Sequence, residues 1–381
     1  MGCESSKTKF QEKDLVLAQQ YQETGDECLK RKSFLNAVNF YHKALEIEVG
    51  LNKCCNKTLL KKFRSLASSY QGLENYEEAL SYERKAMNIV KKNKKKFVGT
   101  ILDIQKNMEV IYEKQGNYKE ANKICLKRLD SAKKFLGKQH IECDKAAYDL
   151  AALYWKFDYK EEALKNFTAL ARTIKALGKE ENHPLAAKCY IHLGLIMKDK
   201  GNNRLALKFH RTALKIITAN KANQKDVDID IPRLYLNIAL AQKNQMDFKG
   251  AWKNLKRALE LETQSPNRQE NKIREIIKVM VFITRIVPEL KEEMLGGMEW
   301  LEKKFKEEEA RASLRSTTAS RSRFVSPLDF QKIRESVTTN PRRTAAYPEE
   351  KDEDDEEEGI EIMDTTMLTQ GSFSVAPLLG N

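Results

Sequence analysis

The feature that most constrains the fold of this chain is an alanine that recurs at a nearly constant spacing. It occupies six positions: Ala37, Ala79, Ala121, Ala163, Ala206 and Ala251. The intervals between them are 42, 42, 42, 43 and 45 residues. Apolar residues with helical periodicity flank a short polar turn ahead of each alanine. Repetition of this kind predicts a row of helical hairpins, in which each unit buries its apolar face against its neighbours.

Two adjacent copies in the middle of the chain show what each hairpin needs. Small residues stand where the two helices must approach closely, namely Ala151 and Gly194 in the first helix and Ala163 and Ala206 in the second. Larger apolar residues are expected to fill the remaining space between the helices. The sequence therefore predicts an all-α protein, a right-handed α-α superhelix of about six hairpins over residues 18–265.

Three of the expected turns share a second signature. Glu74-Asn-Tyr76-Glu, Gly116-Asn-Tyr118-Lys and Met246-Asp-Phe248-Lys each place an aromatic residue three positions before the recurring alanine. This pattern resembles the tetratricopeptide repeat, whose usual unit has ~34 residues. The unit here is longer, at 42 residues. The resemblance implies a solenoid that binds protein or peptide segments.

The longer unit is similar to that of the kinesin light chain group of these repeats. Two junctions strengthen the similarity: Leu136-Gly137-Lys138-Gln139-His140, and Leu177-Gly178-Lys179 followed by His183-Pro184. Their glycines are expected to end one helix, and Pro184 suits the first turn of the next. Four positions depart from the pattern, because an aromatic residue is replaced by Glu83 and Leu255 and a small residue by Arg128 and Leu170.

The charge of the chain is strongly positive and unevenly distributed. The whole sequence carries a net charge of +13. Residues 311–381 hold nine basic and thirteen acidic residues, a net −4, which leaves +17 for residues 1–310. A basic body of this kind favours acidic partners, such as acidic peptides or an anionic membrane face. The alternative is that the lysines only keep long helices soluble.

The concave face of stacked hairpins is lined by their first helices, and the inward positions here are mainly basic. In the kinesin light chain group an asparagine on this face grips the main chain of an extended peptide, since an amide both donates and accepts hydrogen bonds. The surrounding lysines would select acidic side chains, and two aromatic residues would supply an apolar anchor. The predicted peptide-binding residues are Lys61, Arg64, Lys106, Asn107, Lys145, Tyr148, Trp155, Lys188, Lys198, Arg233, Asn237 and Lys243.

The N-terminus reads Met1-Gly2-Cys3-Glu4-Ser5-Ser6-Lys7. Gly2 with Ser6 fits the N-myristoylation pattern, and Cys3 is a candidate for palmitoylation. Two acyl chains are needed for stable anchoring, because one myristoyl group binds membranes only marginally. The segment resembles the dual-acylation start of Src-family kinases. We therefore expect residues 1–17 to be an acylated segment that holds the protein at the cytoplasmic face of a plasma or ciliary membrane.

The C-terminal third departs from the repeat pattern. Apolar helices over residues 266–310, divided by Pro288 and Gly296-Gly297, are expected to cap the last hairpin. Residues 311–381 are rich in Ser, Thr and like-charge runs, which predicts a disordered tail. Its acidic block, Glu349–Glu358, is expected to compete with partners by occupying the basic groove of its own chain.

The sequence gives no sign of catalysis. The five histidines do not cluster with cysteine or carboxylates at metal-ligand spacing, and no nucleotide-binding or nucleophile motif is present. Seven scattered cysteines without a Cys-x-x-Cys pair indicate a reduced, intracellular chain. We expect a non-catalytic membrane-anchored adaptor that needs no cofactor. The alternatives are a motor- or cilium-associated adaptor without lipid in the cytoplasm, and a nuclear histone-chaperone-like or nucleic-acid-associated binder.

Overall fold

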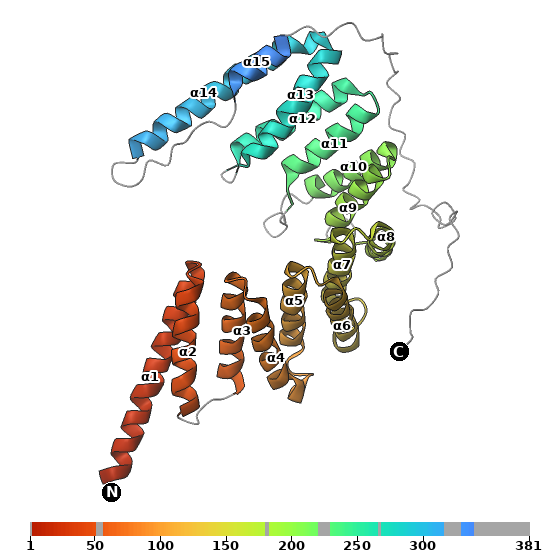
Figure 1. Cartoon of the computed structure of the whole chain (residues 1–381). Helices are drawn as coiled ribbons and strands as arrows, with labels where there is room; N and C mark the ends of the chain where they lie inside the picture. The colour runs from red at the N-terminus through yellow and green to blue at the C-terminus, as the bar shows by residue number, and fades with distance from the viewer. Residues whose placement is uncertain are drawn as a thin grey trace. The chain divides into compact units, whose positions relative to one another are not determined.

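The computed structural model describes residues 2–50, 56–179, 183–219, 229–265, 268–315 and 329–338, with side chains for all of these except 2–13, 50, 56 and 308–315. Over these residues the protein is all-α (Figure 1). Consecutive helices pair into hairpins. The first helices of the six hairpins are α1 (Gly2–Lys30), α3 (Asn56–Gly72), α5 (Val98–Lys114), α7 (Ile141–Lys156), α9 (Ala186–Asp199) and α11 (Ile231–Asn244).

The second helices complete the hairpins and join them into stacks. They are α2 (Phe34–Gly50), α4 (Tyr76–Val90), α6 (Tyr118–Leu136), α8 (Lys160–Ala176), α10 (Asn203–Ala219) and α12 (Phe248–Gln264). A short 3-10 turn, η1 (Lys91–Asn93), follows α4. The second helix of a hairpin also packs on the first helix of the next, as α2 does on α3 and α10 on α11.

The chain divides into two compact units, Met1–Ala171 and Arg172–Asn381, with the boundary inside α8. The first unit therefore holds the first three hairpins and most of the fourth. The second unit holds the last two hairpins and the C-terminal helices.

The recurring alanines lie inside the hairpins, as predicted. All six, Ala37, Ala79, Ala121, Ala163, Ala206 and Ala251, have no exposed side-chain surface. The residues four positions later are equally buried, with at most 1% exposure: Tyr41, Glu83, Cys125, Phe167, His210 and Leu255. Because this second position is ordinarily filled by an aromatic or aliphatic side chain, the ionisable Glu83 and His210 there are unusual.

Close packing in the hairpins depends on matched volumes across the two helices. A Cβ atom added to Gly25 would lie 2.6 Å from the Tyr41 ring, and one added to Gly194 would lie 2.4 Å from the His210 ring. The third hairpin reverses the arrangement, since the large Glu109 stands at the equivalent place in α5 and the small Cys125 stands in α6. A large side chain on one helix is thus accommodated by a small one on its partner.

The hairpin turns repeat with the same period as the alanines. One residue in each turn adopts a left-handed backbone conformation, at Lys32, Glu74, Gly116, Asp158, Gly201 and Met246, with φ between 59° and 77°. Asparagine or aspartate then caps the second helix in several hairpins, as Asn75 does by accepting a hydrogen bond from the Glu78 N–H. The turn geometry is therefore built into every unit, although only two of the six residues are glycine.

The junction glycines behave as predicted, with one difference. Gly137, at φ 92°, follows the last residue of α6, and Gly178, at φ 63°, follows α8. Pro184 lies two residues before α9 rather than in its first turn. The turn that precedes α9 is instead stabilised by the His183 side chain, because its Nδ1 accepts a hydrogen bond from the Leu185 N–H at 3.2 Å.

Helices after the sixth hairpin cover its apolar surface. They are α13 (Glu270–Ile286), η3 (Pro288–Leu290), α14 (Lys291–Arg315) and α15 (Phe330–Thr338). Ile273, Met294 and Leu301 join the same buried cluster as Leu255 of α12. Pro288 separates α13 from α14 as expected, but Gly296 and Gly297 lie within α14 and do not interrupt it.

Two parts of the predicted disordered tail are helical, since residues 311–315 continue α14 and a further stretch forms α15. Residues 330–338 form α15, because Phe330, Ile333 and Val337 make an apolar stripe with helical spacing that packs on the core of the second unit. Asp329 caps the helix by accepting a hydrogen bond from the Lys332 N–H at 3.1 Å. Residues 316–328 and 339–381, including the acidic block, lie outside the described residues.

The N-terminal helix α1 runs from Gly2 to Lys30. The helix thus begins well before residue 18, where the repeat was expected to start, and Ala18 is the first core residue among the described side chains. The side chains of Gly2 and Cys3 are not among those described, so their acylation stays a prediction from the sequence.

Candidate functional site

The first unit brings three of the predicted peptide-binding residues to one cavity, which we call the α3 groove. Its volume is about 450 Å³. Lys61 and Arg64 of α3 and Asn107 of α5 line it together with Leu29 of α1. Three successive first helices therefore contribute to one surface, as the repeat resemblance implied.

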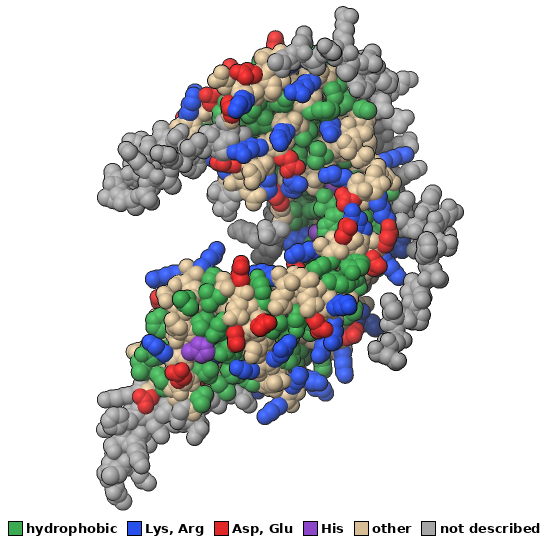
Figure 2. Space-filling model, viewed as in Figure 1, with side chains coloured by type: hydrophobic (Ala, Val, Ile, Leu, Met, Phe, Trp, Pro, Cys, Tyr) green, Lys and Arg blue, Asp and Glu red, His purple; other side chains and the backbone are tan. Residues whose placement is uncertain are grey.

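Two of the basic residues that line this groove, Lys61 and Arg64, are paired with carboxylates from neighbouring first helices. Lys61 Nζ lies 3.0 Å from Asp26 Oδ2, and Arg64 lies 3.5 Å from Asp103 Oδ2. Asp26 also accepts a hydrogen bond from the Tyr41 hydroxyl at 2.9 Å. Burial alone would raise the pKa of Asp26, but the bonds from Lys61 and Tyr41 hold it below its usual value. Figure 2 shows basic and acidic side chains interspersed on the visible surface.

Asn107 binds a buried carboxyl group instead of standing free for a peptide. Its Nδ2 donates to Oε1 of Glu83 at 2.8 Å, while Oε2 of Glu83 has no hydrogen-bond partner. Burial raises the pKa of Glu83 to about 7, although the Asn107 hydrogen bond and the nearby Arg64 charge act against the rise. The groove therefore has behind it a carboxyl group whose charge changes near neutral pH.

Lys106 belongs to a four-residue ionic cluster that joins α5, α6 and α7. Its Nζ lies 3.0 Å from Glu109 and 2.9 Å from Asp149. Arg128 of α6 lies 2.5 Å from Asp149 and 3.4 Å from Glu109. Burial favours neutral Lys106, but the two carboxylates outweigh it and raise its pKa. Removing one member of such a cluster leaves a buried charge without its partner, so this lysine has a structural role.

The other predicted residues of the first unit lie along α7. Lys145 is half-exposed and pairs with Glu142 on the same helix at 2.8 Å. Tyr148 packs edge-on against Phe167, with ring centroids 5.7 Å apart. Trp155 is partly exposed. None of the three lines the α3 groove.

The predicted residues of the second unit lie in different environments. Lys188 and Lys198 are partly exposed on α9, and the Lys198 charge helps burial to lower the pKa of His210 to about 4. Arg233 pairs with Glu275 of α13. Asn237 is only 2% exposed, and its Oδ1 has no hydrogen-bond partner. A buried Asn237 is not accessible to a peptide main chain in this arrangement.

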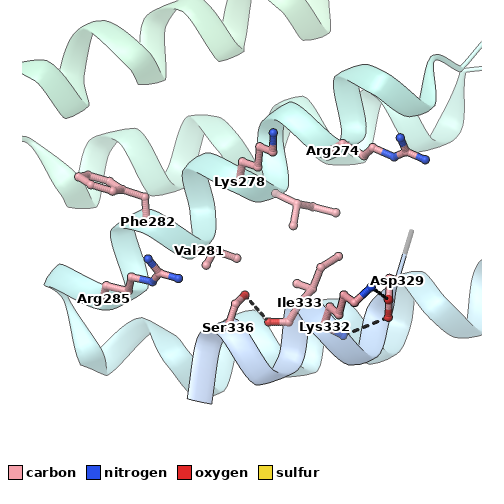
Figure 3. Close-up of a pocket in the computed structure, with 10 residues that line it drawn as sticks. Arg274, Lys278, Val281, Phe282, Arg285, Asp329, Lys332, Ile333 and Ser336 are labelled. Atoms are coloured by element: carbon pink, nitrogen blue, oxygen red, sulfur yellow. Dashed lines mark hydrogen bonds and ion pairs between the residues drawn. The ribbon is translucent and has the colours of Figure 1, made fainter. Parts of the chain in front are cut away.

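Sequence reasoning missed a second cavity, which we call the α13–α15 groove. Its volume is about 540 Å³. Val281 of α13 and Ile333 of α15 face into the space between the two helices (Figure 3). The predicted Lys243 lies beside it, with its Nζ 5.1 Å from the centre of the exposed Phe282 ring. The apolar spacing of residues 330–337 was the sequence signal that could have indicated this groove.

The described residues offer no sign of a metal centre or a membrane span. Among them, no three His, Cys, Asp or Glu side chains gather where they could hold a metal ion. Within the same part of the chain, no helix combines the length and apolar character that crossing a bilayer needs.

Comparison with known proteins identifies the class of fold. A sequence model of the tetratricopeptide repeat matches residues 63–92, which cover much of α3 and all of α4. By sequence, no curated protein matches this chain. The match over residues 63–92, together with the hairpin geometry, places the fold in the tetratricopeptide repeat class.

One solved structure similar to this chain agrees with this assignment, and two others are reported with it. A signal-transduction ATPase with a tetratricopeptide repeat sensor from Pyrococcus horikoshii has a TM-score of 0.53 and 16% identity, over 69% of this chain and 38% of that one. BtubC (BKLC) from P. vanneervenii has a TM-score of 0.48 and 17% identity, over 68% and 95% of the two chains. A putative kinesin light chain from Podosopora anserina has a TM-score of 0.45 and 17% identity, over 56% and 99%. At these identities the likeness concerns the fold alone.

Proposed function

We propose that this protein is a non-catalytic scaffold that binds an extended, acidic segment of a protein partner in the α3 groove. The observation that carries the proposal is the meeting of Lys61, Arg64 and Asn107 in one cavity formed by successive first helices. Guanidinium and ammonium groups there suit carboxylate side chains. One N–H of the Asn107 amide is bonded to Glu83, and its second N–H and its oxygen suit a peptide main chain.

The ion pairs already present in the groove are compatible with ligand binding. The Lys61 side chain is 62% exposed and its partner Asp26 is 31% exposed. Exposed pairs of this kind contribute only about 0.2–1 kcal/mol, so a ligand carboxylate can replace one at low cost. The buried cluster around Arg128 is different, since breaking it would leave desolvated charges. We therefore assign binding to the α3 groove and not to the Lys106 cluster.

A charge-reversal experiment tests this proposal. The variant Lys61→Glu with Arg64→Glu should bind a fluorescein-labelled, Glu-rich peptide at least about tenfold more weakly than the wild type, as expected from losing two charge-assisted contacts. The control is Lys119→Glu with Lys127→Glu, which changes the net charge equally at exposed positions on α6. Equal weakening by both variants would show only non-specific attraction, and no weakening by either would refute the proposed site.

We further propose that acyl groups on Gly2 and Cys3 hold this scaffold at the cytoplasmic face of a membrane. What supports this is the N-terminal sequence, in which Ser6 and Lys7 complete the acylation pattern. The test is cell fractionation of the wild type and of Gly2→Ala, with mass spectrometry of the N-terminal peptide. Loss of the variant from the membrane fraction is expected. An unmodified N-terminus in the wild type would instead favour an adaptor without lipid.

A further inference from the structure

The α13–α15 groove has the properties of a docking surface that the proposed function does not use. The large apolar side chain at its edge, Phe282, is 46% exposed. Val281 and Ile333 extend the apolar surface along the two helices (Figure 3). Apolar side chains gathered in an exposed cavity of a folded protein commonly mark an interaction site.

Basic side chains surround this apolar strip. Arg274, Lys278, Arg285 and Lys332 all line the groove. Its single acidic lining residue is Asp329, which lies 3.1 Å from Lys332. Among the described residues, no ion pair joins Lys278 or Arg285 to a carboxylate. The groove therefore differs from the α3 groove, where Lys61 and Arg64 are already paired.

The chain itself contains a segment that matches this pattern. Residues 349–358 read Glu-Glu-Lys-Asp-Glu-Asp-Asp-Glu-Glu-Glu, and the apolar Ile360, Ile362 and Met363 follow directly. The groove needs the same two properties in its ligand, a dense negative charge and adjacent apolar side chains. An acidic block alone would satisfy only the first of these.

The connection between the groove and this segment is long enough. Ten residues, 339–348, separate the end of α15 from Glu349. A flexible chain of that length spans about 17 Å on average, and about 33 Å when extended. The groove runs along α13 from Arg274 to Arg285, which is about 16 Å of helix. Every part of it is therefore within reach at the millimolar effective concentration that a short linker provides.

We propose that residues 349–363 dock in the α13–α15 groove of their own chain, with the acidic block against Arg274, Lys278 and Arg285 and the isoleucines against Phe282. This gives the acidic tail a binding site other than the basic groove along the first helices that the sequence alone suggested. The inference does not depend on peptide binding in the α3 groove. A partner able to displace the tail would have to combine acidic and apolar residues in the same way.

Zero-length carbodiimide cross-linking of the full chain tests the proposal, because it joins a lysine amine directly to a contacting carboxylate. Peptide mapping should show links from Lys278 or Lys332 to residues 349–358. A mixture of isotopically light and heavy chains should show these links within one chain. Links mainly to Lys61, links between chains, or no links from the tail would each overturn the proposal.

A matched pair of variants separates specific docking from general attraction. Arg274→Glu with Arg285→Glu keeps both reporter lysines and should lower the yield of these links about tenfold. The control Lys249→Glu with Lys253→Glu, at exposed positions of α12, should leave the yield unchanged. Circular dichroism checks that both remain folded.

The apolar part of the contact needs its own variant. Ile360→Ser with Ile362→Ser keeps every tail carboxylate, so it should lower the yield of links several-fold only if the apolar residues hold the tail in place. An unchanged yield would show that charge alone directs the tail and would overturn the docked arrangement.

Discussion

Glu83→Gln is the substitution whose effect follows most directly from the structure. Glu83 is 1% exposed inside the second hairpin, where its Oε1 accepts a hydrogen bond from Asn107 at 2.8 Å. Glutamine has the same shape and keeps an oxygen for Asn107, but it never becomes charged. The substitution therefore isolates the free energy of holding a carboxylate in a desolvated position.

The magnitude and the sign both come from the shifted pKa. Burial raises the pKa of Glu83 from 4.5 to about 7. Between these values the folded protein keeps the proton and the unfolded chain releases it, so the stability of the wild type falls as pH rises through this window. At about 1.4 kcal/mol per pKa unit, the full change is about 3 kcal/mol. Glu83→Gln should gain this amount relative to the wild type by pH 7 and keep it above.

Urea unfolding followed by circular dichroism, at intervals from pH 4.5 to pH 8, measures this difference. The control is Glu77→Gln, an exposed position on the same helix, for which the difference from the wild type should not follow this profile. A free-energy difference between Glu83→Gln and the wild type that stays constant across the range would refute the reasoning. The variant should also bind the Glu-rich peptide more tightly above pH 7, because a negative charge behind the α3 groove is removed.

Three further predictions concern other parts of the molecule. Gly116→Ala should lower the free energy of unfolding by about 1 kcal/mol, because φ is 71° there, although no atom lies close enough to clash; urea unfolding measures it. His210→Leu should remove a loss of stability on acidification between pH 6.5 and 4, since burial lowers the histidine pKa to about 4 and only the unfolded chain binds the proton in that window; thermal unfolding across that range shows whether the slope disappears. Val337→Asp should release α15, because this side chain is fully buried, and hydrogen exchange over residues 330–338 should then become fast while α11 stays protected.

The hairpin architecture could be predicted from the sequence because its determinants are local. Two helices and a turn place small residues at a fixed interval, so the spacing of Ala37, Ala79 and Ala121 reports the fold without any knowledge of long-range contacts. The same period reappears in the left-handed turn residues. Glu83 and Arg128 could also be recognised in the sequence as departures from the repeat pattern. The side chains that contact them could not.

Only the tertiary structure decided what the basic face can do. Lys61 is paired with Asp26, 35 residues away, and Arg64 with Asp103, 39 residues away. Such pairs depend on which side chains meet when successive first helices stack, and the repeat period does not specify them. The α13–α15 groove was missed for a related reason, because α15 is short and becomes helical where its apolar stripe is buried on a core built by distant residues. The sequence thus determined the repeating unit, while packing between units determined which charges remain available to a ligand.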